Sequence, residues 1–258
     1  MTIRPLISVI VCAHNEEDYV SKCLSALQHA LKGYENEILL IADRCKDNTV
    51  KKSQEYPVRI IEKNWKHWRS SYSESLQIGF LNAKGYYLSI VDADIVVPPN
   101  FFRKLIPCIN GRTVSVAADV ITYPETFLNR LMNAWERTYK LAPAGRAPYG
   151  AARVLLRNAL KEIGGFRDVP TPDTDVDIRF ARHGYNSVTN KEVKVYHMRR
   201  ITLKTVVNGQ INCGRGRYWL GISFSRTLGH ALLRFRPFTV YGWLLEKRLA
   251  ERTNLKLP

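Results

Sequence analysis

The sequence is poor in cysteine and in acidic residues, and it has no long hydrophobic run. Its five cysteines are scattered, odd in number and without a CxxC pair. This pattern argues against a disulfide framework or a thiolate zinc site and is typical of a reducing compartment. No stretch reaches the roughly 18 apolar residues of a membrane-spanning helix. No signal peptide is visible before His14, so we expect a cytoplasmic protein.

The overall composition is that of a folded globular chain. Of the 258 residues, 45% are hydrophobic, 10% aromatic and 24% charged. These proportions exclude a disordered or fibrous protein. A chain of this length buries a sizeable core and forms one large domain, or one domain with an appendage.

The charge is strongly positive and unevenly placed. The chain has 39 Lys and Arg against 23 Asp and Glu, a net charge of +16. Residues 194–258 hold thirteen of the basic and only two of the acidic side chains. Such a region attracts phosphates of nucleic acid, lipid headgroups or a substrate. We therefore expect a catalytic domain over residues 1–200 and a basic, amphipathic helical segment over residues 201–258.

Short apolar runs alternate with helical patterns in the first half of the chain. The runs have no period of two, as in strands that are buried on both faces of a parallel sheet. The pattern predicts an α/β fold with a doubly wound, mostly parallel sheet and helices on both faces. The predicted strands cover residues 7–11, 37–42, 57–61, 86–91 and 113–118, and the predicted helices cover residues 20–31, 73–83, 101–106, 127–139 and 178–182. In the tail the pattern predicts short helices, broken at residues 214–216 and at Pro237.

Acidic side chains follow the ends of two predicted strands. Asp43 follows the second strand, and Asp92 and Asp94 follow the strand that ends at residue 91. Ligands bind at the carboxyl ends of the strands in an open parallel sheet. On an extended chain, residues i and i+2 face the same way, so we expect both carboxylates to meet at one point. Such a pair is unfavourable without a cation, and hard oxygen ligands favour Mg²⁺ or Mn²⁺.

A second acidic cluster spans residues 173–177. Asp at the start of a helix complements the helix dipole, so capping is one interpretation. The other is that a carboxylate here accepts the proton of an incoming hydroxyl group. Both roles coexist if Asp175 or Asp177 caps the helix and Asp173 acts as the base.

Five segments, in order, resemble the nucleotide-sugar-dependent glycosyltransferases of family 2, which have the GT-A fold. The similarity runs from about residue 7 to about residue 200. It includes an opening strand with a turn of the NEE type, a second strand with an acidic loop, a DxD motif, a segment that ends in GGF, and an acidic segment in place of the family's EDxDL. In this chain these are residues 7–17, 37–49, 92–94, 150–166 and 173–176.

The resemblance implies a role for each matching residue. Glu16 and Asp43 would line the pocket for the base and ribose of a UDP or GDP sugar. Asp92 would lie near the ribose and the metal, and Asp94 would bind Mg²⁺ or Mn²⁺ at the diphosphate. The donor site as a whole is assigned to Ala13, Asn15, Glu16, Asp43, Arg69, Asp92, Ala93 and Asp94. Asp173 matches the family's base, and His197 matches a position that completes the metal shell in some relatives.

Two segments depart from the family pattern. Pro172 replaces the glutamate that precedes the base, so Asp175 remains a rival base. Residues 65–72 replace the family's small-residue and Asn segment, and either Lys66 or Arg69 would reach a phosphate there. The other interpretation of this stretch is a solvated basic loop with two half-buried tryptophans.

The resemblance implies inversion at the anomeric carbon. A retaining enzyme needs a second carboxylate about 5–5.5 Å from the first, and none is evident. The acceptor would be a glycan hydroxyl or a polyprenyl phosphate, and a phosphate acceptor needs no base.

Two other functions fit parts of the sequence. A sugar-1-phosphate nucleotidyltransferase shares the strand order and the metal, but it opens with a glycine-rich loop where this chain has Ala13-His14-Asn15-Glu16-Glu17. A nucleic-acid-binding protein fits the basic tail, but the acids at the sheet edge would repel a phosphate backbone, so we expect no nucleic-acid partner.

The basic tail mixes arginines with aromatic and aliphatic residues. This mixture is typical of a helix that lies in a membrane interface, with arginines on anionic lipid. We expect peripheral attachment to the inner face of the cell membrane. The alternative is that these helices pack on the sheet and turn their arginines to solvent or to the donor diphosphate.

Overall fold

The computed structural model describes residues 7–124, 126–127, 129–131 and 150–252. The chain folds into two compact units. Unit 1 comprises residues 1–123, 144–167 and 172–199, and unit 2 comprises residues 124–143, 168–171 and 200–258.

Unit 1 is built on one eight-stranded sheet with the order β3-β2-β1-β4-β7-β6-β8-β5. The first four positions in this order are parallel, β7 is antiparallel to both its neighbours, β6 and β8 are parallel, and β5 is antiparallel to β8. The strands are β1 (Ile7–Ala13), β2 (Asn36–Asp43), β3 (Arg59–Lys63), β4 (Tyr87–Val91), β5 (Ile95–Val96), β6 (Thr113–Thr122), β7 (Ala152–Leu156) and β8 (Asn186–His197).

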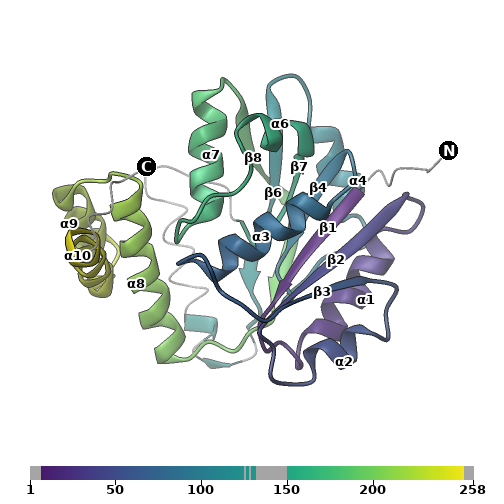
Figure 1. Ribbon diagram of the computed structural model, residues 1–258, viewed down its shortest axis with the longest axis horizontal. Helices are drawn as coiled ribbons and strands as arrows, with labels where there is room; N and C mark the ends of the chain where they lie inside the picture. Colours follow the sequence, from purple (N-terminus) through teal and green to yellow (C-terminus); the bar gives the residue numbers. More distant parts are fainter. Residues whose placement is uncertain (1–6, 125, 128, 132–149, 253–258) are drawn as a thin grey trace. The chain divides into compact units, whose positions relative to one another are not determined.

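Helices cover both faces of this sheet (Figure 1). One core lies under α1 (Val20–Ala30), α2 (Thr49–Ser53) and α4 (Phe101–Leu105), which continues into the 3₁₀ helix η1 (Ile106–Cys108). The other lies under α3 (Ser71–Asn82), α6 (Arg157–Glu162) and α7 (Pro172–Arg182). Apolar residues of β1 alternate between the two cores, so this strand is buried on both faces. The predicted α/β class and mostly parallel sheet are confirmed.

Three strands of this sheet were not predicted. β5 has only two residues, too few for any pattern. β8 is largely exposed and polar, with an irregular register against β6, so its sequence lacks the apolar alternation of a half-buried strand. β7 lies in the centre of the sheet, where it separates β4 from β6.

Unit 2 contains α8 (Leu203–Trp219), α9 (Phe224–Leu233) and α10 (Pro237–Arg252). The predicted break at residues 214–216 is wrong, because α8 runs through them. A Cβ atom on Gly214 would overlap the Thr239 carbonyl oxygen, and one on Gly242 would overlap the Ile211 carbonyl oxygen. The glycines therefore allow α8 and α10 to cross with their backbones in close contact. The predicted boundary at Pro237 is confirmed as the start of α10.

Most of the helix predicted over residues 127–139 lies outside the described residues. Among the helices that the structure describes, none combines the length and the apolar character needed to cross a membrane.

Candidate active site

The loops that follow β1 and β2 are tied together by side-chain hydrogen bonds. The Thr49 hydroxyl oxygen accepts from the Glu16 backbone N–H (2.7 Å) and donates to Asp47 Oδ1 (2.5 Å). Asp47 Oδ2 accepts from the Glu17 backbone N–H (3.0 Å). Asn15 has a left-handed backbone (φ 56°), and its side-chain oxygen accepts from the Lys46 N–H (2.8 Å). These bonds fix the Asn15-Glu16-Glu17 turn at the carboxyl edge of the sheet.

Asp43, the last residue of β2, is almost fully buried and surrounded by donors. Arg44 Nε lies 2.8 Å from Asp43 Oδ1, Lys63 Nζ lies 3.2 Å from the same oxygen, and the Ser71 hydroxyl donates to Oδ2 (2.5 Å). Burial alone would raise the pKa of Asp43, but the bonds from Arg44, Ser71 and Lys63 hold it below its usual value. Asp43 is therefore a carboxylate at neutral pH.

Lys63, the last residue of β3, was missed by the sequence analysis. Its side chain has no exposed surface, and its ammonium group contacts Asp43 and Glu74 Oε2 (3.0 Å) and donates to the Ser71 hydroxyl (2.8 Å). Glu74 Oε1 in turn accepts from the backbone N–H groups of His67 (2.9 Å) and Trp68 (3.3 Å). This buried ion network fixes the loop before α3.

The Asp92-Ala93-Asp94 segment is a tight turn between β4 and β5 and not an extended chain. The Asp92 carbonyl oxygen accepts from the Ile95 N–H (3.0 Å), which closes the turn. The two carboxylates consequently have different partners, and the extended geometry on which the expectation of one shared point rests is absent. They still lie close enough for the charge of Asp94 to raise the pKa of Asp92. Asp92 Oδ1 accepts from the Tyr72 hydroxyl (2.8 Å), whereas Asp94 is directed at the end of β8.

Asp94 is the centre of a charged cluster. Its Oδ2 atom lies 2.9 Å from His197 Nε2 and 2.8 Å from Arg199 Nε. Arg199 also forms an ion pair with Glu16 Oε1 through its Nη2 atom. The Asp94 side chain is only 2% exposed, but that of Arg199 is 46% exposed. One half-exposed arginine side chain therefore forms ion pairs with two buried acids.

The charges in this cluster change each other's protonation. Burial, followed by repulsion from Asp94, raises the pKa of Asp92 to about 7. Burial also raises the pKa of Glu16 to about 7, although Arg199 partly offsets it. The pKa of Asp94 is lowered in spite of its burial, because of His197 and Arg199. The pKa of His197 is raised by Asp94 although burial opposes this. His197 and Arg199 therefore oppose the effects of burial and of Asp94 on the pKa of Asp92.

Asp173, in the first turn of α7, is a further acid near Tyr72. Burial raises its pKa, and the nearby Arg153 opposes this effect. Arg153 is itself buried and donates to Asp177 Oδ1 (2.6 Å) and to the Ser115 hydroxyl (2.5 Å). A Cβ atom on Gly150 would lie 2.6 Å from Asp173 Cβ, so only glycine fits against this side chain.

Tyr72 connects Asp173 electrostatically to the DxD turn. The pKa of Tyr72 is raised well above its usual value by burial, by Asp92 and, less strongly, by Asp173. The residue is nevertheless 36% exposed, so part of its surface is available to a ligand. The site therefore combines a charged cluster, a phenol and a carboxyl group of raised pKa.

The sequence model of the family described as Glycosyl transferase family 2 matches residues 8–164. The match covers more than half of the chain. It includes the two hydrogen-bonded loops that follow β1 and β2, and the DxD turn. The chain belongs to glycosyl transferase family 2. The predicted membership of this family is confirmed.

Curated relatives of this family member match part of its length. A dolichol-phosphate mannosyltransferase of Pyrococcus furiosus is 32% identical over 117 residues, which cover 43% of this chain and 32% of the relative. An uncharacterized glycosyltransferase of Haemophilus influenzae is 34% identical over 107 residues, covering 40% and 32%. The chain thus spans about a third of the length of the curated relatives it matches.

Solved structures share the fold of this family 2 chain. A mannosyltransferase from Pyrobaculum calidifontis in complex with GDP-Man and Mn²⁺ has a TM-score of 0.65 at 19% identity, over 94% of this chain and 70% of that one. Glucosyl-3-phosphoglycerate synthase from Mycobacterium tuberculosis in complex with Mn²⁺, UDP and phosphoglyceric acid has a TM-score of 0.58 at 18% identity, over 81% and 75%. At these identities the similarity shows the fold alone.

The remaining predicted site residues of this family 2 chain lie in two environments. Ala13 and Ala93 are buried, at the end of β1 and in the DxD turn. Lys66 and Arg69 are exposed in the loop before α3. Arg199, which the sequence analysis missed, lies two positions after His197, just beyond the end of β8.

Asp175, the rival base, has a structural partner in this family 2 chain. It is buried and accepts from Arg179 Nε (2.8 Å), and Arg179 also donates to the carbonyl oxygens of Ile163 (2.5 Å) and Gly165 (2.7 Å). These bonds anchor the turn that ends α6. Asp175 thus stabilises the packing of α7.

We expect Arg179→Met to destabilise unit 1 strongly. Removal of one member of a buried ion pair leaves the other charge uncompensated, at a cost of about 3–5 kcal/mol. Urea unfolding followed by circular dichroism measures the loss. Asp175→Asn keeps a side-chain oxygen for Arg179 and should cost less while it leaves turnover per folded molecule unchanged. A folded Asp175→Asn protein without turnover would instead make Asp175 the base.

The raised pKa of Asp92 predicts a pH-dependent difference between the wild type and Asp92→Asn. The folded carboxyl group binds its proton up to about pH 7, whereas an unfolded one loses it near its ordinary pKa, so the contribution of Asp92 to stability falls as the pH rises. Asparagine keeps an acceptor for the Tyr72 hydroxyl. In EDTA we expect the variant to be more stable than the wild type by about 2 kcal/mol at about pH 8, and the gain to shrink towards about pH 5. Urea unfolding at both pH values tests this, and a gain that does not depend on pH would contradict it.

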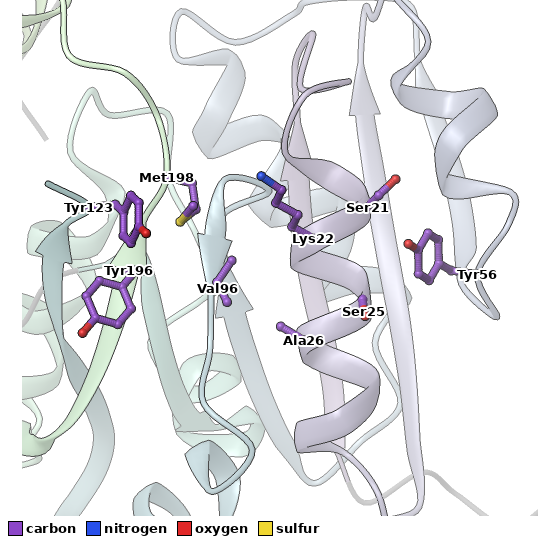
Figure 2. Close-up of a pocket in the computed structure, with 9 residues that line it drawn as sticks. All are labelled: Ser21, Lys22, Ser25, Ala26, Tyr56, Val96, Tyr123, Tyr196 and Met198. Carbon is purple, nitrogen blue, oxygen red and sulfur yellow. The ribbon is translucent and has the colours of Figure 1, made fainter. Parts of the chain in front are cut away.

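A groove of about 670 Å³ lies between α1 and the strands β5 and β8 (Figure 2). Tyr196 and Met198 line it, one on each side of His197 in the sequence. Side chains alternate along an extended chain, so these two face away from Asp94. The groove is lined by Ser21, Lys22, Ser25, Ala26, Tyr56, Val96, Tyr123, Tyr196 and Met198.

Proposed function

We propose that this chain is an inverting glycosyltransferase that moves a sugar from a nucleoside-diphosphate sugar to an acceptor. The observation that carries the proposal is the cluster of Glu16, Asp92 and Asp94 at the carboxyl edge of the sheet, together with Asp173 near Tyr72. Ligands bind at this edge of a parallel sheet. Glu16 and Asp94 are buried, and the pKa values of Glu16 and Asp92 are raised to about 7, as expected of a functional site.

The proposed donors are GDP-mannose and UDP-glucose. The names of two similar structures include GDP-Man and UDP with Mn²⁺. In this chain Asp43 is a carboxylate at neutral pH and would accept from a ring N–H of the base, while Glu16 would contact the ribose. Arg69, exposed in the loop before α3, would contact the diphosphate.

The donor set suits Mg²⁺ or Mn²⁺. Within the part of the chain that the structure describes, no three His, Cys, Asp or Glu side chains converge as a metal site. The partners of buried Asp94 Oδ2 are the cations His197 and Arg199, and burial followed by repulsion from Asp94 raises the pKa of Asp92, so an added cation would relieve the repulsion between the two carboxylates. Asp94 would bind the ion, with Asp92 and His197 beside it, and diphosphate oxygens would complete its shell. When bound, the metal neutralises charge on the leaving diphosphate.

Arg199 would leave Asp94 when the donor binds. Its side chain is 46% exposed, whereas Asp94 is 2% exposed and fixed in a turn. Once released, it would offer its N–H groups to the diphosphate, whose oxygens are bidentate acceptors.

The reaction is a single displacement. The acceptor oxygen forms a bond with the anomeric carbon on the face opposite the nucleotide, the bond from that carbon to the diphosphate oxygen breaks, and the nucleoside diphosphate leaves with the electron pair. Asp173 takes the proton of a hydroxyl acceptor. Its raised pKa brings it closer to the range in which a general base works well.

The proposed acceptor is lipid-linked. The name of one relative that matches 43% of this chain is dolichol-phosphate mannosyltransferase. Unit 2 is basic and exposes aromatic and aliphatic side chains, which fits peripheral contact with an anionic cytoplasmic leaflet.

A donor panel tests the proposal. The full chain is incubated with Mn²⁺ and each of several nucleotide sugars, and binding is scored by thermal shift and slow hydrolysis by release of nucleoside diphosphate. We expect one donor to stabilise the protein more in Mn²⁺ than in EDTA. No metal-dependent stabilisation by any donor, and no hydrolysis, would contradict the proposal.

A further inference from the structure

The turn between α9 and α10 in unit 2 exposes large apolar side chains. Leu232 is 69% exposed, Leu233 84% and Phe235 81%, and Phe238, in the first turn of α10, is 42% exposed. We refer to residues 232–238 as the apolar turn. Transfer of such side chains out of water is favourable, so a concentration of them on a surface marks a contact site.

The backbone of the apolar turn makes phenylalanine an unfavourable residue at position 235. Phe235 has a φ of 50°, in the left-handed region that ends many helices and that glycine adopts at little cost. Arg236 N–H donates back to the Ala231 carbonyl oxygen (2.8 Å), as in a regular helix cap. The ring is almost fully exposed, so burial within unit 2 does not offset the strain. A contact between this ring and a molecule outside the chain would offset the strain.

Positive charge surrounds the apolar turn. Arg234 and Arg236 flank Phe235 in the sequence. Burial, followed by the charges of Arg217, Arg234 and Arg236, lowers the pKa of His230 to about 4. Three guanidinium groups therefore lie near the His230 side chain at the end of α9. The electrostatic potential of this region is positive and favours an anionic partner.

The exposed apolar residues continue along both helices. Phe224, Leu228 and Leu232 recur every four residues on α9, and Phe238, Tyr241 and Leu244 follow a spacing of three on α10. Residues at these spacings lie on one face of a helix. Each helix thus adds an apolar stripe, of which the apolar turn is the most exposed part.

We propose that the apolar turn inserts into an anionic lipid surface, with Leu233 and Phe235 among the acyl chains and Arg234 and Arg236 at the depth of the phosphates. The proposal rests on the proposed peripheral attachment and names the element responsible for it. A lipid surface fits because it offers apolar and anionic groups together, as the turn requires. A nucleic acid would offer phosphates and bases for stacking, but no acyl phase for the aliphatic side chains of Leu232 and Leu233.

Vesicle binding by the full chain tests the insertion. Wild type is co-sedimented with vesicles of phosphatidylcholine and with vesicles of phosphatidylcholine mixed with phosphatidylglycerol, over a salt series. We expect binding to the anionic vesicles that weakens with salt. The double variant Leu233→Ser/Phe235→Ser should bind them about tenfold more weakly or worse. The matched control is Leu81→Ser/Tyr86→Ser, which removes two exposed apolar residues from unit 1 and should bind like the wild type.

The variant Phe235→Gly shows whether the Phe235 ring stabilises the fold or binds lipid. Glycine relieves the left-handed strain, so we expect a melting temperature equal to or above that of the wild type together with weaker vesicle binding. Phe235→Trp provides a depth measurement, since a ring that inserts should shift its fluorescence to the blue and be quenched by brominated acyl chains.

Three results would overturn the insertion. They are a wild type that stays in the supernatant, a double variant that binds like the wild type, and a double variant whose only change is from dimer to monomer. Nucleotide release from the donor is measured on the same proteins without vesicles. Normal release with altered vesicle binding separates this inference from the proposed function, and absent release in all proteins would contradict the latter alone.

Discussion

Asp94→Asn is expected to lower metal-dependent binding of nucleoside diphosphate by about two to three orders of magnitude. Asp94 is 2% exposed and stands between His197 and Arg199, and it is the acid that we propose as the ligand of the cation. Asparagine keeps the shape and the turn but removes that charge. The side chains of Arg199 and His197 are 46% and 34% exposed, so solvent can hydrate both and the fold should survive. Titration calorimetry with GDP and UDP, in Mn²⁺ and in EDTA, measures the effect.

The control for this experiment is Asp18→Asn, which removes one negative charge from an exposed position beyond the Glu16 turn. It should bind nucleotide as the wild type does. If Asp94→Asn keeps the same affinity and the same dependence on Mn²⁺, the metal assignment fails, and Asp94 is then only the anchor of Arg199.

Asp173→Asn is expected to lower turnover to a hydroxyl acceptor by about 10²- to 10⁴-fold, the usual contribution of a general base. Donor affinity should stay within about twofold of the wild type, because only the proton transfer is lost. Asparagine fits the space against Gly150, which has no room for a larger neighbour. Single-turnover kinetics and equilibrium donor binding separate the two quantities.

Glu192→Gln is the matched control for Asp173→Asn, since this carboxylate is exposed on β8 and forms an ion pair with Lys104 at the surface. A loss of donor affinity equal to the loss of turnover would make Asp173 a binding residue. Unchanged turnover would exclude it as the base and indicate an acceptor that attacks through a phosphate oxygen.

The sheet was predictable where strands are buried on both faces. Residues 7–11 and 37–42 are apolar runs because β1 and β2 are covered on both sides. Such a run can be recognised as a strand without knowing which strands pair with it. β8 was not predictable, because its pairing with β6 depends on backbone hydrogen bonds that leave little trace in its side chains. The glycines of α8 were misread, because a glycine that allows a close helix crossing looks the same in sequence as one that ends a helix.

The acids of the site were predictable, but their partners were not. Strand ends place Asp43, Asp92 and Asp94 at one edge. The cations come from residues far apart in the chain, as Lys63 and Arg199 show. Only the fold brings these cations to the acids. Basic residues near strand ends are common in any sequence, so their presence alone does not identify which of them pair with the site.

The strand order has a consequence for synthesis on the ribosome. β4 ends at Val91, and its neighbour β7 begins at Ala152, about sixty residues later, although β6 is made in between. At a synthesis rate of about 5–20 residues per second, the edge of β4 that pairs with β7 stays unpaired for roughly 3–12 s. β6 could pair with β4 first, in the wrong place. Codon usage or chaperone contact over residues 92–151 would therefore affect the yield of folded protein more than the same change near the C-terminus.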